Sequence, residues 1–394
     1  MARPHFSSCL ELLQAMVAVD TVNGHISGRP RAEEALSHLL EEQAGAMGFQ
    51  TRRLPVRDAG FNLLVRHDGG GGRPWLLFES HLDTVSVSAM TIEPFAGRIS
   101  EGRIYGRGTC DTKGSGAAML WALGQYAACG ACPNNVALLF TLDEEIGKTG
   151  IRAFVDDLPS LGPRPFGAIV GEPTEMLPVT AHNGLVRWSL RTKGIAAHSA
   201  DPSKGRSAIR LMCDVISEIE EKYIAGLAAT HPLTGKAQCS INVIRGGTQI
   251  NIIPEACEIQ VDRRVVPGED PLDATPALQR LLDGLAKRNP RMDVTIEPWM
   301  IDWPLDPTGA GQFVGWVQRV LDETGVPSEA RGAGYATEAS DLARSGIPSV
   351  VLGPGSVAQA HTHNEWLDLR QLELATHVYE SLMRCPFGQA GGPT

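Results

Sequence analysis

Acidic and histidine residues gather in five short segments of this 394-residue chain, each next to a strand or helix that the hydrophobic pattern predicts. Ligands of open α/β sheets bind beyond the carboxyl ends of the strands, so we expect these side chains to meet at one edge. Imidazole and carboxylate groups together suit Zn²⁺, with Co²⁺ or Mn²⁺ as alternatives. The residues concerned are His81 and Asp83, Asp111, Asp143 with Glu144 and Glu145, Glu172, and His361.

Each segment taken alone also has a structural explanation. The spacing of His81 and Asp83 is common, Asp111 at a helix start can act as a cap, and adjacent carboxylates can line a solvated loop. Together the segments supply two histidines and three or four carboxylates. That number suits two metal ions about 3.5–4 Å apart that share a carboxylate, with one further glutamate as a general base.

Composition and charge exclude several other classes of protein. The chain has 35 basic and 45 acidic residues, and the net charge of −10 argues against nonspecific nucleic-acid binding. Its eight cysteines are scattered, which is not typical of a disulfide scaffold. Gly106 and Gly108 suggest a dinucleotide-binding loop, but the third glycine of that fingerprint and an acidic residue about 20 positions later are missing.

Neither a membrane span nor a secretion signal is expected. No stretch approaches the ~18–20 consecutive apolar residues that a transmembrane helix needs. The first eight residues do not resemble a signal peptide. From these two features we expect a cytoplasmic location.

Strands alternate with helices in the first 179 residues, and the same element types return near the C-terminus, which predicts an α/β sheet covered on both faces. The glycine-rich residues 68–73 predict a hairpin loop between the first two strands. The predicted strands are 62–66, 74–79, 135–142, 166–171 and 349–353, and the predicted helices are 9–19, 32–47, 114–129, 308–323 and 368–385.

The pattern changes near residue 180, where strands begin to alternate polar and apolar residues. The order of elements becomes strand, helix, strand, strand, helix, strand, which predicts a split βαβ sandwich of about 115 residues. These elements are 184–193, 207–223, 237–245, 256–264, 271–288 and 293–297.

The order of the motifs resembles a family of co-catalytic zinc hydrolases that includes acetylornithine deacetylase, succinyl-diaminopimelate desuccinylase, aminoacylase and glutamate carboxypeptidase. Segments 335–339 and 353–361 are most similar to the acetylornithine deacetylase branch. The resemblance implies an α/β fold in which residues 1–179 and 298–394 form a mixed-sheet, zinc-peptidase-like catalytic domain. Residues 180–297 would form an inserted α+β lid and dimerisation domain. The motifs are Ser80–Asp83, 106–114, 143–145, 171–174 and 360–365.

The resemblance implies two Zn²⁺ ions per chain, bridged by Asp111. The remaining ligands would be His81 and Glu172 on one ion and Glu145 and His361 on the other.

Two further residues receive roles in the same way. Glu144 would be the general base that takes a proton from the attacking water and passes it to the leaving amine. Asp83 would lie behind His81 and orient its ring. The Asp111–Thr112 peptide bond would be cis.

The resemblance also assigns residues of the lid. His198 would reach the active site of a partner subunit and stabilise the oxyanion. Asn251 and Arg264 would bind the substrate. Arg263 competes with Arg264, because adjacent residues of a strand face opposite ways and only one can enter the site. Ser207 stands where the family often has asparagine, which leaves the capping of the following helix open.

The resulting hypothesis is a di-zinc amidohydrolase that deacylates an N-acyl amino acid and forms a homodimer through the lid. The attacking group would be a hydroxide held by the metals. Within the family, a metallo-carboxypeptidase, a dipeptidase or a succinyl-diaminopimelate desuccinylase remains an alternative. A metal-dependent binding protein without catalytic activity is the alternative from another class, and a dinucleotide-binding enzyme is a more distant one.

Overall fold

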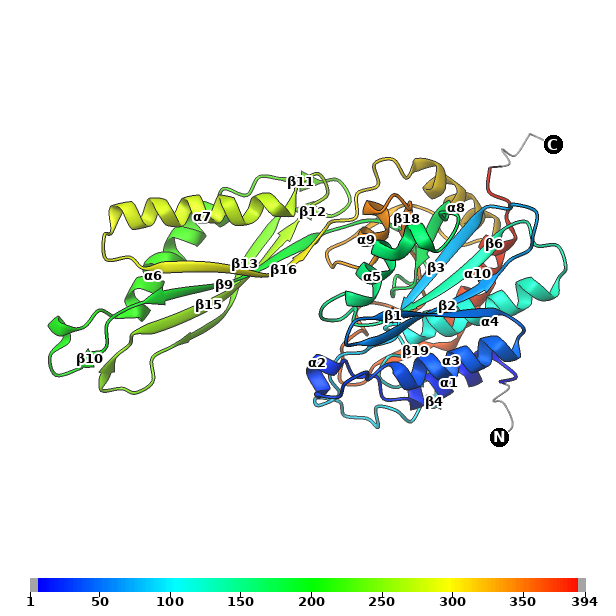
Figure 1. Ribbon diagram of the computed structural model, residues 1–394, viewed down its shortest axis with the longest axis horizontal. Helices are drawn as coiled ribbons and strands as arrows, with labels where there is room; N and C mark the ends of the chain where they lie inside the picture. Colours follow the sequence, from blue (N-terminus) through cyan, green and yellow to red (C-terminus); the bar gives the residue numbers. More distant parts are fainter. Residues whose placement is uncertain (1–5, 389–394) are drawn as a thin grey trace. The chain divides into compact units, whose positions relative to one another are not determined.

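The chain divides into two compact units, seen here in a computed structural model whose described residues are 6–388. The first unit contains the described residues up to Thr180, together with Pro307–Arg331 and the chain from Thr337 onward. The second unit contains Ala181–Asp306 and Gly332–Ala336. In Figure 1 most of the second unit is the green and yellow part of the chain that carries the labels α6, α7, β13 and β16.

Within residues 6–388, eight strands of the first unit and its boundaries form one mixed sheet in the order β1-β2-β6-β3-β7-β18-β8-β17. The four central strands β6, β3, β7 and β18 run parallel, and their neighbours β2 and β8 are antiparallel. The bounds are β1 Gln50–Val56, β2 Gly60–His67, β3 Trp75–His81, β6 Asn135–Thr141, β7 Gly167–Val170, β8 Val179–His182, β17 Arg331–Ala333 and β18 Ser349–Val351.

The prediction of a hairpin at residues 68–73 is wrong. β6 lies between β2 and β3, and it pairs antiparallel with β2 and parallel with β3. Every residue of β3 is buried, as in a strand with neighbours on both sides and helices on both faces. The glycine-rich loop therefore connects two strands that are not adjacent, and it makes no tight turn between paired strands.

Helices cover both faces of the large sheet. On one face, alternate residues such as Leu63, Phe78 and Phe140 join the apolar core with α1, α3, α4, α8 and α10. On the other face, Asn62 donates a hydrogen bond to Gly150 of α5, and α9 packs against α5 and β7. The bounds are α1 Cys9–Ala18, α2 Gly24–Ser27, α3 Glu34–Ala46, α4 Lys113–Ala128, α5 Thr149–Asp157, α8 Gly311–Glu323, α9 Ala339–Arg344 and α10 Leu369–Arg384.

A small antiparallel sheet of the order β19-β5-β4 completes the first unit. Its strands are β4 Arg98–Ser100, β5 Arg103–Tyr105 and β19 Trp366–Asp368. This sheet joins the segment before Asp111 to the segment after His361. None of the described helices is both long and apolar enough to cross a lipid bilayer.

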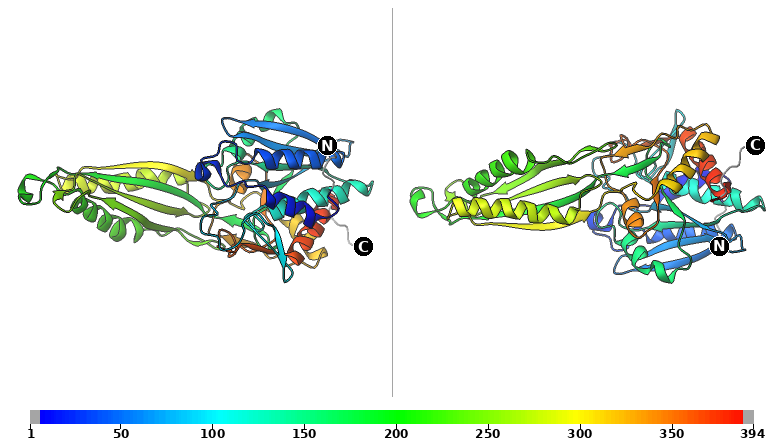
Figure 2. Two further views of the ribbon diagram at one scale, coloured as in Figure 1. Left: turned by 90° about the horizontal axis from the view of Figure 1, so that it is seen from below. Right: turned by 90° about the horizontal axis from the view of Figure 1, so that it is seen from above.

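The second unit has the predicted strand, helix, strand, strand, helix, strand order. Four antiparallel strands lie in the order β13-β15-β9-β16, and α6 and α7 pack against each other and against this sheet (Figure 2). Trp188 is buried at the centre of the core, and its indole N–H donates to Thr275. The bounds are β9 Gly184–Lys193, α6 Ala208–Glu218, β13 Gln238–Gly246, β15 Ala256–Val265, α7 Pro271–Arg288 and β16 Val294–Asp302.

Three local features refine the sequence analysis of this unit. The last strand, expected at 293–297, continues to Asp302. Helix α6 passes into a π-helical turn at Ile219–Ile224. Ser207 caps α6, because its hydroxyl accepts the backbone N–H of Arg210. Two short ribbons, β10 Ala197–His198 with β14 Ile252–Ile253 and β11 Thr230–His231 with β12 Gly235–Lys236, complete the unit.

Candidate active site

The parallel strands of the first unit bring the acidic and histidine segments together. His81 is the last residue of β3, the segment from Asp143 to Glu145 follows β6, and Glu172 follows β7. His361 lies in the loop after β18, and Asp111 lies two residues before the start of α4. Because parallel strands end at the same edge, these segments form one site, as the sequence analysis expects.

The two carboxylate oxygens of Asp111 face two different histidines. Oδ1 lies 3.1 Å from Nε2 of His81, and Oδ2 lies 3.3 Å from Nε2 of His361. Each histidine has a second carboxylate beside it: Glu172 lies 3.7 Å from His81, and Glu145 lies 3.2 Å from His361. The arrangement is therefore two sets of candidate ligands that share one carboxylate.

The chemistry of this donor set fits divalent cations. Candidate ligand atoms of His81, Asp111 and Glu145 all lie within 4.8 Å of one another, and the same holds for His81, Glu144 and Glu172. Burial raises the pKa of Glu172 well above its usual range, and the charge of Asp111 raises it further. A buried group of carboxylates of this kind needs positive charge, which protons or metal ions can supply.

The histidine pKa values show the same need for positive charge. Hydrogen bonds to Asp111 and Glu145 raise the pKa of His361 to about 10. Burial opposes the protonation of His81, but hydrogen bonds to Asp111 and Asp83 outweigh it and hold the pKa of His81 well above its usual value. A metal ion at either histidine would displace such a proton.

Asp83 contacts both His81 and the loop that carries the glutamates. Nδ1 of His81 lies 3.0 Å from the backbone carbonyl of Asp83 and 3.5 Å from its carboxylate. The carboxylate of Asp83 accepts the backbone N–H groups of Glu144 at 2.9 Å and Glu145 at 3.1 Å. Asp83 is fully buried, so it ties the loop after β6 to the end of β3.

Glu144 lies beside the two sets of candidate ligands, and Nζ of Lys148 is 3.8 Å from its carboxylate. Burial raises the pKa of Glu144 to about 8, although Lys148 and His81 act in the opposite direction. A carboxyl group with a pKa near neutrality can both accept and return a proton. The Asp111–Thr112 peptide bond is cis, which confirms the expectation from the resemblance.

Two residues that position Asp111 received no role from the sequence. Oε1 of Glu365 accepts hydrogen bonds from the backbone N–H groups of Cys110 at 2.9 Å and Asp111 at 3.1 Å. Oε2 accepts a hydrogen bond from the guanidinium of Arg107 at 2.6 Å. Glu365 is fully buried and comes from the same loop as His361. The sequence did contain a signal, because Glu365 is the last residue of the 360–365 motif and Arg107 lies between Gly106 and Gly108 of the 106–114 motif.

A second pair of carboxyl groups lies buried on the face of the sheet covered by α5 and α9. The hydroxyl of Thr141 lies 2.9 Å from Glu79 and 2.7 Å from Glu338. Burial raises the pKa of both glutamates, and each also hydrogen-bonds the other. The hydrophobic pattern of β3 gave no indication of Glu79, because the residue stands inside an otherwise apolar strand.

The second unit brings two of its three predicted residues together. His198 pairs with Ile252 in the β10–β14 ribbon, and the backbone N–H of Ser199 donates to the carbonyl of Asn251. His198 and Asn251 are both exposed. Arg264 lies near the opposite end of β15, about 25 Å away at ~3.3 Å per residue. In Figure 1, β10 and β12 mark these two ends.

The two adjacent arginines face opposite sides of the four-stranded sheet of the second unit, as expected. Arg263 is buried, and its guanidinium pairs with Glu269 at 2.6 Å. Arg264 is 30% exposed and pairs with Asp262 at 2.6 Å. Arg264 is therefore the more accessible of the two.

The sequence is similar to those of known proteins over most of its length. The profile of peptidase family M20/M25/M40 matches residues 77–384. Acetylornithine deacetylase of Yersinia pestis is 32% identical over 383 residues, covering 92% of this chain and 94% of that protein. Acetylornithine deacetylase of Pectobacterium carotovorum is 31% identical, with 92% and 93% covered.

Solved structures share the fold at lower sequence identity. An M20 metallo-carboxypeptidase from Sulfolobus solfataricus is 17% identical with a TM-score of 0.82, covering 96% of this chain and 99% of that one. A dinuclear metal-binding M20 peptidase from Bacillus subtilis is 15% identical with a TM-score of 0.72, covering 97% and 98%. From the family match and the deacetylase relatives together, we conclude that the chain belongs to peptidase family M20/M25/M40 and is a hydrolase that acts on amide bonds.

Proposed function

We propose that this hydrolase is a di-zinc enzyme that removes the acyl group from an N-acyl amino acid. The observation that carries the proposal is the position of Asp111, whose two oxygens face His81 and His361 with a glutamate beside each histidine. The deacetylase names of relatives that cover more than nine tenths of the chain support an acetylated amino acid as substrate.

The residues present would hold two ions in the order that the sequence analysis expects. Asp111 would bridge them. Two divalent cations at this place would polarise the acyl carbonyl and make a water molecule acidic enough to react at neutral pH. The four outer ligands would be His81 and Glu172 on one ion and Glu145 and His361 on the other.

Glu144 is the proposed proton carrier of the reaction. It lies among the proposed ligands, 3.8 Å from Nζ of Lys148, and its raised pKa suits reversible proton transfer. Glu144 would take the proton of the attacking water and then deliver it to the amine that leaves.

His198 is the proposed donor to the oxyanion. Its Nδ1 accepts the backbone N–H of Ala200 at 3.1 Å, so in the neutral ring the proton resides on Nε2. That nitrogen can then donate to an oxygen that becomes negative during the reaction.

His198 and Arg264 cannot contact one small substrate from the same chain, because about 25 Å separates them along the lid sheet. We therefore propose a homodimer in which each active site receives His198 and Asn251 from one subunit and Arg264 from the other. Arg264 would hold the substrate carboxylate with its planar guanidinium.

The experiment that tests the function is hydrolysis of N-acetyl-ornithine by the purified protein after zinc is restored, with and without a chelator. We expect about two zinc ions per chain and release of acetate that the chelator stops. The Glu144→Gln variant is the matched control, because it keeps every proposed ligand. Zinc binding with cleavage of dipeptides alone would make the protein a peptidase, and no metal with no hydrolysis would contradict the proposal.

The homodimer is tested by mixing two inactive variants. Glu144→Gln lacks the base but keeps His198, whereas His198→Ala keeps the base but lacks the histidine. If His198 acts across subunits, mixed dimers contain one complete site, and random exchange restores about a quarter of the original activity. No recovery, despite exchange that a tagged subunit demonstrates, would place His198 in its own subunit's site or outside the reaction.

A further inference from the structure

Asn23 lies outside every motif discussed so far, yet it joins two buried carboxylates of the candidate active site. One N–H of its side chain donates to Oδ2 of Asp83 at 2.8 Å, and the other donates to Oδ1 of Asp143 at 2.9 Å. Its own Oδ1 accepts the backbone N–H of His25 at 2.9 Å. Asn23 is 1% exposed, so these bonds have no competition from bulk water.

The backbone around Asn23 is attached to the same part of the site. The N–H of Asn23 donates to the carbonyl of Thr84 at 2.9 Å, and the N–H of Thr84 donates to Thr21 at 3.0 Å. This pairing aligns the segment before α2 with the segment that directly follows Asp83. The side chain of Asn23 therefore has a defined position relative to Asp83.

Asp83 and Asp143 together define the loop that carries the proposed base. Asp83 accepts the backbone N–H groups of Glu144 and Glu145. Asp143 has a positive φ of 61°, a region that residues other than glycine occupy rarely, and its carboxylate accepts the hydroxyl of Thr149 at 2.8 Å. Each carboxylate thus holds one side of the same short loop.

The amide of Asn23 is the group that lets these two carboxylates coexist at close range. Two buried carboxylates repel each other unless hydrogen-bond donors lie between them. An asparagine offers two N–H donors on one nitrogen, which is the number required here. Glutamine has the same group on a longer side chain, and aspartate has no donor when ionised.

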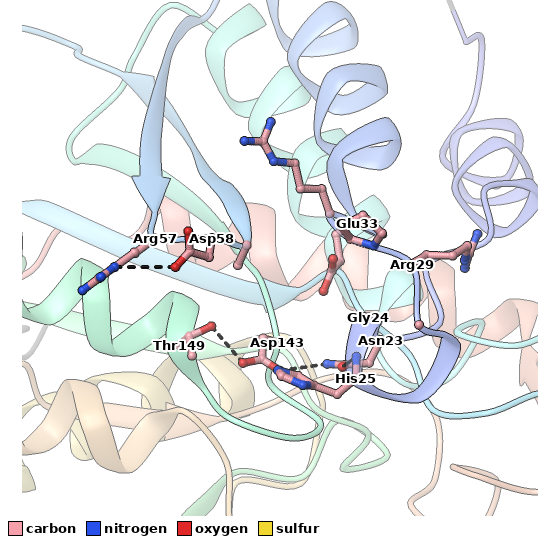
Figure 3. Close-up of a pocket in the computed structure, with 13 residues that line it drawn as sticks. Asn23, Gly24, His25, Arg29, Glu33, Arg57, Asp58, Asp143 and Thr149 are labelled. Atoms are coloured by element: carbon pink, nitrogen blue, oxygen red, sulfur yellow. Dashed lines mark hydrogen bonds and ion pairs between the residues drawn. The ribbon is translucent and has the colours of Figure 1, made fainter.

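A cavity of about 470 Å³ adjoins this arrangement (Figure 3). Asn23, Asp143 and Thr149 line it, whereas Asp83 is fully buried. Figure 3 shows the bonds that run from Asn23 to Asp143 and from Asp143 to Thr149 along its wall. Removal of the Asn23 side chain would open a path for water from the cavity to Asp83.

We propose that Asn23 is a positioning residue of the hydrolase, which acts through Asp83 and Asp143 on the loop of Glu144 and Glu145. The inference rests on the proposed function, in which Glu145 is a metal ligand and Glu144 is the base. It assigns no contact between Asn23 and substrate.

The test compares Asn23→Asp with Asn23→Ala. Aspartate preserves the shape but places an acceptor between two carboxylates, whereas alanine leaves space that water from the cavity can fill. We expect zinc affinity and kcat to fall about 10-fold in Asn23→Ala and about 100-fold in Asn23→Asp, with little change in KM. A role in packing alone predicts the reverse order, because alanine removes more volume.

Asn134 provides the matched control at the other end of β6. It is also fully buried, and its side-chain nitrogen also donates two hydrogen bonds, to the backbone carbonyls of Met383 and Cys385. Asn134→Asp should lower the unfolding temperature as Asn23→Asp does, but leave zinc affinity and kcat unchanged. If an aspartate variant does not fold, Asn23→Ala and Asn134→Ala are compared by the same measurements.

The outcomes separate this inference from the proposed function. Zinc affinity in Asn23→Asp equal to that of the wild type, or higher than that of Asn23→Ala, would overturn the positioning role. Absence of hydrolysis by the wild type would contradict the proposed function only, because the order of zinc affinities still decides the role of Asn23.

Discussion

In the first unit most of the candidate ligands are buried and several elements hold them. In the second unit His198, in the β10–β14 ribbon, and Asn251, directly before β14, are both exposed. Asp111, for example, is held by contacts with His81, His361 and Glu365, which lie far apart in the sequence. His361 is the most exposed of the candidate ligands, with 52% of its side chain accessible.

This difference indicates which groups are arranged before substrate arrives. A buried charge is stable only where partners surround it, so the first unit must carry its partners within its own fold. An exposed histidine has no such requirement. Changes at the buried candidate ligands should therefore alter metal binding, and a change at His198 should alter turnover alone.

Replacement of Asp111 should have the largest effect. Asp111→Asn keeps the shape but replaces one of the two oxygens that face the histidines with an N–H₂ group, which does not ligate metal. We expect loss of the shared ligand, less than one zinc per chain, and no detectable hydrolysis. Zinc analysis after dialysis and the N-acetyl-ornithine assay check this, and two retained zinc ions would contradict the bridging position.

Replacement of Glu144 should come next and should separate chemistry from metal binding. Glu144→Gln removes the group that accepts the proton, so kcat should fall about 10²–10⁴-fold while two zinc ions remain. The measurement is kcat beside zinc content in the same preparation. A variant that retains turnover would exclude Glu144 as the base.

Replacement of His198 tests the role of the exposed residues in the second unit. His198→Ala should lower kcat about 10²–10³-fold, the usual effect of removing one donor to an oxyanion. Zinc affinity and unfolding temperature should not change, because the side chain is exposed and its one hydrogen bond is local. A loss of zinc affinity in this variant would show that the two units are not independent in the way described.

The features that the sequence predicted well are those with a local signal. The strands β3 and β6 are continuous apolar runs, and the acidic residues that follow them mark the edge of the sheet. The strand β1 was not predicted, since Arg52, Arg53 and Pro55 interrupt its pattern. The prediction of a hairpin at 68–73 was wrong because a glycine-rich loop indicates only that the chain turns. It does not indicate which strands pair, and here β6 lies between β2 and β3.

The residues around the ligands were harder to predict for the same reason. Asn23 meets Asp83 and Asp143 across 60 and 120 residues of sequence, and no spacing rule connects such positions. Glu365 meets Asp111 across 254 residues. Such contacts follow from the topology of the sheet, which the sequence pattern specified only in part.

Replacement of Glu33 should have the smallest effect on turnover. It tests whether a buried charge in the first unit lowers the free energy of unfolding. Its side chain lines the cavity beside Asn23 and Asp143, and Glu33 is not one of the proposed ligands. Burial, together with the charges of Asp83 and Asp143, raises the pKa of Glu33 to about 7. The folded protein therefore binds a proton at this residue that the unfolded chain releases above its ordinary pKa of 4.5.

The sign of the pH effect follows directly. The contribution of Glu33 to stability is fully present below pH 4.5 and is lost as pH rises through about 7. Between pH 5 and pH 8, Glu33→Gln should therefore gain about 2–3 kcal/mol in unfolding free energy relative to the wild type. Denaturant unfolding of both proteins at the two pH values measures this difference. Glu34→Gln removes the same charge from the partly exposed neighbouring residue of α3, and an equal gain in that control would mean that the burial of Glu33 is not the cause.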